Sequence, residues 1–320
     1  MAKASRPGTL PVEPARPFNN RAMRTRAFGS VAIAIAILTL MDAGVKHWTA
    51  TFGTPQIIFM RYTAGFLVGA IIVVALLALR RVTLPSRASL VRAGQRALMV
   101  SCVAGLFFYS LSVIPLAEAT AIAFTAPIYI ALLGWIVLKE PVAPQTWIAI
   151  VIGLSGVVVI SSGAFQGGEA FSGALSGYIV SALASMFYAG YLVLTRLHAA
   201  SDPVPMMITL QSGFASLFAL VFVVLAGFGV LLDGRALVAP DPGDITFALA
   251  LGFLGTVGHL FMTWGFKNAP AADLGPMEYT SLFWAALYGF FLFDETPGWR
   301  LFVGCGLIVA GTWIVIRGER

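Results

Sequence analysis

Long apolar runs make up most of this chain, and short stretches rich in Gly, Pro and charge separate them. A membrane-spanning helix needs about 20 mostly apolar residues, and ten windows of that kind can be drawn. They cover residues 28–48, 55–79, 97–114, 117–138, 145–163, 174–196, 205–231, 246–266, 271–293 and 299–316. The pattern predicts an all-α integral membrane protein with ten transmembrane helices.

An internal duplication is the most informative feature of the pattern. Residues 115–156 recur without a gap at 270–311, so that Pro115 matches Pro270 and Gly156 matches Gly311. Each copy contains an apolar helix, a short acidic turn and a second apolar helix that carries glycines. We therefore expect one five-helix repeat at 28–163 and another at 174–317.

The odd number of helices in each repeat has a consequence for topology. The second repeat must enter the membrane upside down relative to the first. Two inverted repeats around a central site are typical of secondary transporters, because exchanging the conformations of the repeats opens the site to the other side.

Composition agrees with a membrane protein. The chain is 59% hydrophobic and 11% charged, with a mean hydropathy of +0.89, whereas soluble domains carry about 25% charged residues. The two cysteines, Cys102 and Cys305, both lie inside apolar windows. We expect them to be small packing residues, with neither a disulfide framework nor a metal site.

Lys and Arg fall unevenly on the two sides of the predicted bundle. With the N-terminus inside, sixteen of the 20 lie in the tail or on the inner side; the four on the outer side are Lys46, Arg61, Arg235 and Arg300. The positive-inside rule then places both termini in the cytoplasm, as for a multi-pass protein of a bacterial inner membrane. Residues 1–27 are expected to form a disordered basic tail near anionic headgroups. This topology accounts for the net charge of +6 without a nucleic-acid partner.

Several short motifs resemble a known family. Those of the second half are Leu254-Gly255-Thr256, Gly258-His259, Trp264-Gly265-Phe266, Pro276, Tyr279, Gly289-Phe290, Glu295, Pro297, Gly304 and Gly311. In the first half Arg61, residues 115–121, Pro127 and Lys139-Glu140-Pro141 form a similar set. Together they resemble the EamA-type repeats of the drug/metabolite transporter superfamily over roughly residues 28–317. A riboflavin- or S-adenosylmethionine-transporter-like subgroup is left open.

The resemblance implies a central cavity lined chiefly by helices 1, 3, 4, 6, 8 and 9. Members of the superfamily move amino acids, drugs, nucleotide-like metabolites, S-adenosylmethionine or riboflavin, in either direction. The motifs identify the superfamily specifically, but they give little information on the substrate.

Charged residues inside the spans are the first candidates for a binding site, since each costs roughly 2.5–3.5 kcal/mol at a helix centre on insertion scales. Asp42 and Lys46 lie four residues apart, and Arg61 begins the next span on the same side. They form either a structural ion-pair cluster or part of a substrate or proton site. Glu278 follows Gly275-Pro276 at a depth similar to that of His259. These two are expected either to share a proton or a solute, or to join two helices by a hydrogen bond.

Aromatic residues on the expected cavity helices are the second group of candidates. We single out Tyr109, Tyr188, Trp264 and Tyr279, because a Tyr or Trp in mid-membrane needs a partner for its polar group. About half of the aromatic residues on these helices are expected to be lipid-facing or core residues.

The sequence thus favours a secondary active transporter that moves a small organic metabolite by alternating access. A planar, vitamin-like compound such as riboflavin suits an aromatic, charge-poor cavity, and the alternative is an exporter of amino acids or drug-like amphiphiles. An intramembrane enzyme or a regulatory subunit is a remote alternative, because the sequence has no phosphate loop or metal-ligand spacing. The expected partners are a small-molecule substrate and the lipid bilayer, without a cofactor or metal, and a homodimer is left open.

Overall fold

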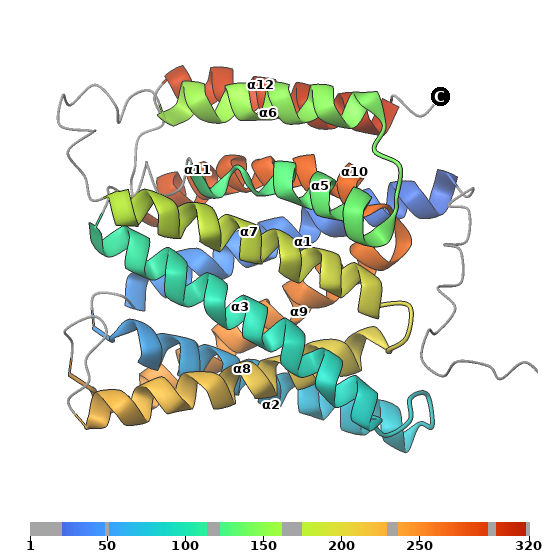
Figure 1. Ribbon diagram of the computed structural model, residues 1–320. Coiled ribbons are helices and arrows are strands. Elements are labelled where there is room, and N and C mark those ends of the chain that lie inside the picture. The colour runs from blue at the N-terminus through green and yellow to red at the C-terminus, as the bar shows by residue number, and fades with distance from the viewer. Residues whose placement is uncertain are drawn as a thin grey trace, which may run out of the picture.

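The computed structural model describes residues 21–48, 51–113, 122–161, 175–228, 236–293 and 299–317. All regular elements in these ranges are helical (Figure 1). They are α1 (Arg21–Trp48), α2 (Thr54–Ala78), α3 (Arg87–Val113), α5 (Ala126–Leu138), α6 (Pro144–Ser161), α7 (Leu175–His198), α8 (Val204–Gly227), α9 (Pro242–Asn268), α10 (Ala271–Leu274), η2 (Gly275–Tyr279), α11 (Thr280–Phe293) and α12 (Trp299–Arg317). Glu295, Pro297 and residues 115–121, which carry part of the family resemblance, lie outside the described ranges.

Six helices are long and apolar enough to cross a membrane by length and composition: α1, α2, α3, α7, α8 and α9. Helix α5 and part of α12 are shorter apolar helices. Large hydrophobic side chains point outward from the bundle, among them Ile71 at 72% exposure, Trp135 at 60% and Phe302 at 68%. A water-soluble protein rarely shows so much apolar surface, so the chain is a multi-pass membrane protein.

Two helices, α1 and α3, begin well before their apolar windows. Helix α3 starts at Arg87, so Arg87, Arg92 and Arg96 lie on the helix and not in the loop where the windows placed them. Helix α1 starts at Arg21, which makes residues 21–27 helical and corrects the expected end of the disordered tail. A helix of this length spans about 40 Å at 1.5 Å per residue, more than the roughly 30 Å of hydrocarbon. Polar turns therefore extend past the apolar core, where hydropathy gives no signal.

The ninth expected span is interrupted. Its first turn is α10, a five-residue 3₁₀ segment η2 follows, and α11 continues to Phe293. Pro276 lacks a backbone N–H and its ring disfavours an uninterrupted α-helix, and Gly275 before it adds flexibility. The regular α-helix is thus interrupted at Gly275-Pro276, and Glu278 lies within the interruption.

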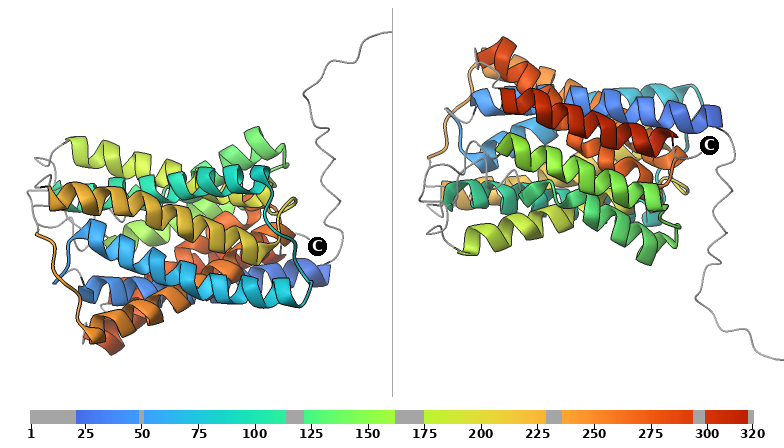
Figure 2. Two further views of the ribbon diagram at one scale, coloured as in Figure 1. Left: turned by 90° about the horizontal axis from the view of Figure 1, so that it is seen from below. Right: turned by 90° about the horizontal axis from the view of Figure 1, so that it is seen from above.

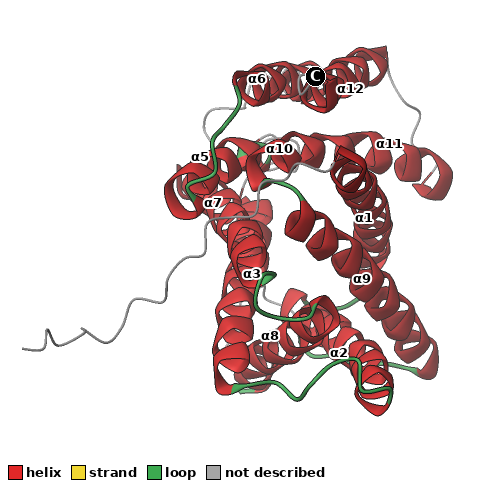
Figure 3. Ribbon diagram, turned by 90° about the vertical axis from the view of Figure 1, so that its right-hand side faces the viewer, coloured by secondary structure: helices red, strands yellow, loops and turns green. Residues whose placement is uncertain are grey.

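The helices run roughly alongside one another, and both ends of the described chain lie at the same end of the bundle (Figures 1 and 2). We call this the terminal end. Helix α2 packs against α8, and α6 packs against α12 to one side of the remaining helices (Figure 3). Helix α1 packs against α9 in the same way that α7 packs against α3, and α11 contacts α1 as α5 contacts α7.

Candidate functional site

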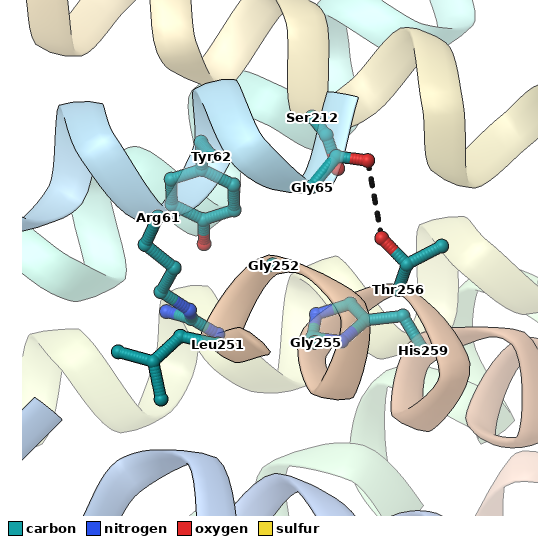
Figure 4. A pocket seen from close by; sticks show the side chains of 9 residues that line it. All are labelled: Arg61, Tyr62, Gly65, Ser212, Leu251, Gly252, Gly255, Thr256 and His259. Atoms are coloured by element: carbon teal, nitrogen blue, oxygen red, sulfur yellow. Dashed lines mark hydrogen bonds between the residues drawn. The ribbon is translucent and has the colours of Figure 1, made fainter. Parts of the chain in front are cut away.

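A small cavity lies between α2, α8 and α9 (Figure 4). Its volume is about 10 Å³, room for roughly one water molecule. The residues around it are Arg61, Tyr62, Gly65, Ser212, Leu251, Gly252, Gly255, Thr256 and His259. Arg61 and His259 both lie over the stretch of α9 around Gly252 and Gly255 (Figure 4). The cavity thus brings together two of the residues expected from the sequence.

Close contact between α2 and α9 sets the geometry of this cavity. A Cβ on Gly252 would lie 2.6 Å from backbone atoms of Ala64 and Gly65, so only glycine allows the two backbones to approach this closely. One turn on, the Thr256 hydroxyl donates a 3.1 Å hydrogen bond to the Gly65 carbonyl. Both contacts fix the register in which Arg61 of α2 faces His259 of α9.

Arg61 carries a charge without a close acidic partner in the described part of the chain. Its Nε lies 3.1 Å from the Met41 sulfur, a weak acceptor, and its Cζ lies 5.0 Å from the centre of the Tyr62 ring. Among the described residues, no carboxylate is within the 4 Å of an ion pair. Asp42 of α1 interacts with Arg61 electrostatically, yet its side chain is exposed and forms no ion pair with the guanidinium.

Glu278 lies in the interrupted ninth span and is 9% exposed. The Tyr188 hydroxyl of α7 donates a 3.0 Å hydrogen bond to its Oε2. Its Oε1 is buried and has no hydrogen-bond donor in the described part of the chain. A carboxylate is a strong acceptor on both oxygens, so this site has unused capacity to accept a hydrogen bond.

A row of rings connects Glu278 to the cavity. The Tyr188 and Tyr191 ring centres are 6.3 Å apart, and those of Tyr191 and His259 are 6.4 Å apart. The structure shows no hydrogen bond between Glu278 and His259. The donor to Glu278 is Tyr188 instead. The His259 Nδ1 is buried and has no hydrogen-bond partner among the described residues. The expected direct pairing of Glu278 with His259 is therefore replaced by contacts through two tyrosines.

The remaining candidates are placed differently. Tyr279 is 1% exposed and its ring packs against Gly153 of α6, a position that leaves no room for a Cβ on that glycine. Trp264 is partly buried against the main apolar core. The side chains of Tyr109 and Lys46 lie outside what the structure describes, although both positions are helical.

A buried arginine was missed by the sequence reasoning. Arg96 is 1% exposed and donates hydrogen bonds to Gln211 Oε1 at 3.3 Å and to the Met207 carbonyl at 3.3 Å, with His198 Nδ1 at 3.0 Å. Gln211 in turn donates to the Tyr191 hydroxyl at 3.2 Å. The signal for Arg96 was its helical spacing from Arg92, which the assignment to a loop concealed.

The three ion pairs between described residues join distant parts of the chain at the terminal end. They are Arg24 with Asp273, Arg92 with Asp202 at 2.6 Å, and Arg196 with Glu140 at 3.0 Å. Hydrogen bonds from Arg92 and Ser89 lower the pKa of the Asp202 carboxyl, although its burial acts in the opposite direction. In the described part of the chain no group of His, Cys, Asp and Glu has the arrangement of a metal site.

Two of these ion pairs hold the start of the interrupted span. Asp273 of α10 also accepts a 3.2 Å hydrogen bond from Thr146 of α6. Glu140 Oε2 accepts one at 3.0 Å from the Ala271 backbone N–H. The short segment that leads to Glu278 is thus attached by side chains from several other elements.

Comparisons with known proteins agree with this architecture. The model of the EamA-like transporter family matches residues 26–162 and again 175–317. An uncharacterized transporter of Helicobacter pylori is 33% identical over 216 residues, which are 65% of this chain and 67% of that protein. The pseudopaline exporter of Pseudomonas aeruginosa is 24% identical over 290 residues, 90% of this chain and 95% of its own length.

Two further similarities extend the comparison. The S-adenosylmethionine uptake transporter of Rickettsia felis is 21% identical over 212 residues, 66% of this chain and 67% of that protein. A solved crystal structure of a protein has a TM-score of 0.73 at 23% identity, covering 93% of this chain and 99% of the other. At that identity the structural match concerns the fold alone.

Proposed function

The chain belongs to the EamA-like transporter family, and from that premise we propose that it moves a small organic metabolite across a membrane by alternating access. The observation that carries the proposal is Glu278: a buried carboxylate on an interrupted helix, with one oxygen that has no hydrogen-bond donor among the described residues. A charged group at such a depth is costly and commonly marks a substrate or ion path. Interrupted helices are where such transporters bind their solutes.

The packing of the helices supports the inverted-repeat part of this proposal. If the two repeats are exchanged, α1 takes the place of α7 and α9 that of α3, and the α1–α9 contact becomes the α7–α3 contact. Helices α2 and α8 exchange with each other, as do α6 and α12. We therefore propose ten spans in two five-helix repeats, with α10, η2 and α11 forming the ninth.

The proposed substrate site contains Glu278 and Tyr188 at one side and Arg61, Asp42 and His259 at the other. The contacts through Tyr191 connect the two sides. We assign Trp264 to the wall of the site. Tyr109 stays a prediction, and the contact of Tyr279 with Gly153 suits a role in packing η2 against α6.

For orientation we propose that the terminal end is cytoplasmic, in a bacterial inner membrane. Most of the basic residues lie there, as the positive-inside rule requires. The three ion pairs between described residues lie there too. They would hold this end closed, which corresponds to a carrier whose site faces the outside.

Substrate and direction are open to two readings. The aromatic residues led to the expectation of a flat, vitamin-like solute such as riboflavin. The charged groups around the cavity suit the alternative, an amino-acid-like or amphiphilic solute. The named relatives include both an exporter and an uptake transporter, so we propose no direction.

Flux through the purified protein tests the proposal. Proteoliposomes are loaded with a defined mixture of amino acids, amines, organic acids and vitamins including riboflavin, and release of each is followed by mass spectrometry. We expect one solute, or one chemical group of solutes, to leave faster than from protein-free vesicles. The Glu278→Gln variant should insert normally and lose at least about 10-fold in rate, because a charged hydrogen-bond partner contributes about 1.5–3 kcal/mol.

The exposed Arg81→Gln variant serves as a control that should transport normally. If no solute leaves faster than from empty vesicles, the chain is not a carrier for these classes. If the Glu278→Gln variant transports as fast as the unchanged protein, Glu278 has no part in the site.

A further inference from the structure

Arg96 is a buried charge that lies outside the proposed substrate site. It is 1% exposed, and each of its three guanidinium nitrogens has a partner. Nε contacts Gln211 Oε1 at 3.3 Å, Nη1 contacts His198 Nδ1 at 3.0 Å, and Nη2 contacts the Met207 carbonyl at 3.3 Å. Among the described residues no carboxylate lies within 4 Å of it. A buried charge is costly, so we expect the contacts that hold this one to have a function.

The contacts of Arg96 join three helices in the half of the bundle nearer the terminal end. Arg96 is on α3, His198 is the last residue of α7, and Gln211 is on α8. Gln211 also donates a 3.2 Å hydrogen bond to the hydroxyl of Tyr191 on α7. We call these residues, with Met207, the Arg96 cluster. In the two-repeat arrangement proposed above, α3 belongs to the first repeat and α7 and α8 to the second, so the cluster connects the repeats.

Helix bounds identify the equivalent positions in the other half of the bundle. Helices α3 and α9 begin 155 residues apart and also end 155 residues apart, while α2 and α8 begin, and α1 and α7 end, 150 residues apart. Three pairs of positions are then equivalent: Arg96 and Leu251, Gln211 and Arg61, and Tyr191 and Met41. A contact supports this register, because Arg61 Nε lies 3.1 Å from the Met41 sulfur just as Gln211 Nε2 lies 3.2 Å from the Tyr191 hydroxyl.

The equivalent positions cannot form the hydrogen bonds of the Arg96 cluster. Leu251 has no polar side-chain atom in place of the guanidinium, and the Met41 sulfur is only a weak acceptor. Leu251 instead lines the cavity beside Arg61 (Figure 4). The contact between the repeats therefore contains a hydrogen-bonded cluster in one half and a cavity in the other.

Resting on the two-repeat transport mechanism proposed above, we propose that the Arg96 cluster is a lock, in which Arg96 and Gln211 position α7 and α8 so that the terminal half of the bundle stays closed. Exchange of the repeats would break its hydrogen bonds, and Leu251 and Met41 would supply no equivalent set. The two conformations are therefore unequal in free energy, and the one with the terminal half closed is favoured. Each turnover of the carrier has to release this lock.

Two equivalent alanines provide matched reporters for the two halves. Ala93 of α3 and Ala248 of α9 are 155 residues apart, and they are 0% and 7% exposed. In a chain with Cys102 and Cys305 replaced by Ser, each alanine is changed singly to Cys. The full-length protein is placed in lipid nanodiscs, where a hydrophilic thiol reagent reaches both faces. The labelling rate then follows the fraction of molecules in which that half is open.

Gln211→Leu should raise the labelling rate of Ala93→Cys about 10-fold or more and lower that of Ala248→Cys. The reason is that a hydrogen bond to a charged group changes a population by a factor of about 10 to 100, and that opening one half closes the other.

Tyr191→Phe is a milder variant, which serves if Gln211→Leu does not fold. It removes the hydroxyl that Gln211 binds and leaves the groups that contact Arg96 in place. A neutral hydrogen bond predicts a rise of about 2- to 10-fold at Ala93→Cys. Gly105→Ala on α3 is the control, because nothing lies within 4 Å of its Cβ position, and both reporters should label as in the unchanged protein.

Opposite shifts at the two reporters distinguish a lock from a general loosening, which would expose both alanines. The inference is overturned if Ala248→Cys labelling does not fall in Gln211→Leu, or if that variant labels like Gly105→Ala at Ala93→Cys. Flux through the unchanged protein separates this result from the proposed function. Opposite shifts without flux of any tested solute would retain the lock and reject the carrier for those solutes. Flux with unaltered labelling in Gln211→Leu would retain the carrier and reject the lock.

Discussion

Tyr188 is the residue that makes the buried Glu278 tolerable. Its hydroxyl is the only donor to that carboxylate among the described residues, at 3.0 Å. A hydrogen bond to a charged group contributes about 1.5–3 kcal/mol, and leaving such a group unsatisfied costs more than losing a neutral pair. The position of Glu278 therefore depends on α7, a helix whose contact residue lies 90 positions earlier in the chain.

Replacing Tyr188 by Phe should weaken transport and stability together. We expect solute flux to fall about 10-fold or more, because Glu278 would lose its described donor and shift or take up a proton. Tyr288→Phe is the matched control: its hydroxyl donates a 3.0 Å bond to the Ala36 carbonyl, away from Glu278. This variant loses a hydrogen bond of the same length to a neutral carbonyl, and it should transport as fast as the unchanged protein. Equal flux in the two variants would show that the Tyr188 hydroxyl is dispensable.

Asp202 provides a pH test at a site outside the spans. Hydrogen bonds from Arg92 and Ser89 lower the pKa of its carboxyl below the ordinary 3.8. A carboxyl whose folded pKa is lowered stabilises the protein above its unfolded pKa, and this stabilisation is lost as the pH falls through the folded value. The contribution should thus be constant from about pH 7 to pH 5, decline from about pH 3.8 downward and disappear once the pH is below the folded pKa.

Melting curves of the unchanged protein and of Asp202→Asn measure this effect. The variant should melt a few degrees lower near neutral pH, since about 1 kcal/mol corresponds to roughly 2–4 °C in a chain of this size. The two curves should approach each other from about pH 3.8 downward and converge once the pH is below the folded pKa. A difference that persists unchanged in acid would mean that charge on Asp202 contributes nothing.

At the scale of the elements, the interrupted ninth span depends on contacts with neighbouring helices. Arg24 and Thr146 bind Asp273, while Glu140 binds Arg196 and the Ala271 N–H. The Arg196–Glu140 pair is nearly buried, and removing one partner of such a pair costs about 3–5 kcal/mol. Short segments such as α10 and η2 have too few internal hydrogen bonds to be stable alone. The elements around them therefore set the position of Glu278.

The approach of α2 to α9 is tested by a glycine pair. Gly252→Ala would place a Cβ 2.6 Å from the backbone of Ala64 and Gly65, and such overpacking typically costs 1–3 kcal/mol. Gly105→Ala is the control, because nothing lies within 4 Å of its Cβ position. We expect Gly252→Ala to lower the melting temperature and the amount of inserted protein, and Gly105→Ala to change neither. Equal melting temperatures and equal amounts of inserted protein in the two variants would show that the close contact of α2 with α9 does not limit stability.

The elements also show how far sequence reasoning reaches. Apolar windows located most helices to within a few residues, because burial in lipid requires about 20 apolar residues in a row. They missed the start of α3, where polar turns follow no hydropathy rule, and so placed Arg96 in a loop. Glu278 was found because a charge stands out in an apolar span. Its partner Tyr188 was named only as an aromatic, since a contact between residues 90 positions apart has no signal in one sequence.

At the scale of the whole molecule, the two ends of the bundle differ. All three ion pairs between described residues are at the terminal end, while Asp42, far along α1, is exposed. Under the proposed exchange of repeats, opening the terminal end would require these pairs to separate. The ion pairs can separate at low free-energy cost only if other contacts replace them, because breaking an ion pair leaves a partly buried charge.

The proposed topology leads to the final prediction. In a background with Cys102 and Cys305 replaced by Ser, a single cysteine is placed at Ser201 or at Ala236, both exposed and at opposite ends of α8. An impermeant thiol reagent added to intact cells should label Ala236→Cys and spare Ser201→Cys until the cells are opened. Asp42→Cys should be labelled from the same side as Ala236→Cys, because the ion pairs close the other end. Labelling of Ser201→Cys in intact cells would reverse the orientation, and protection of Asp42→Cys would place its opening on the cytoplasmic side.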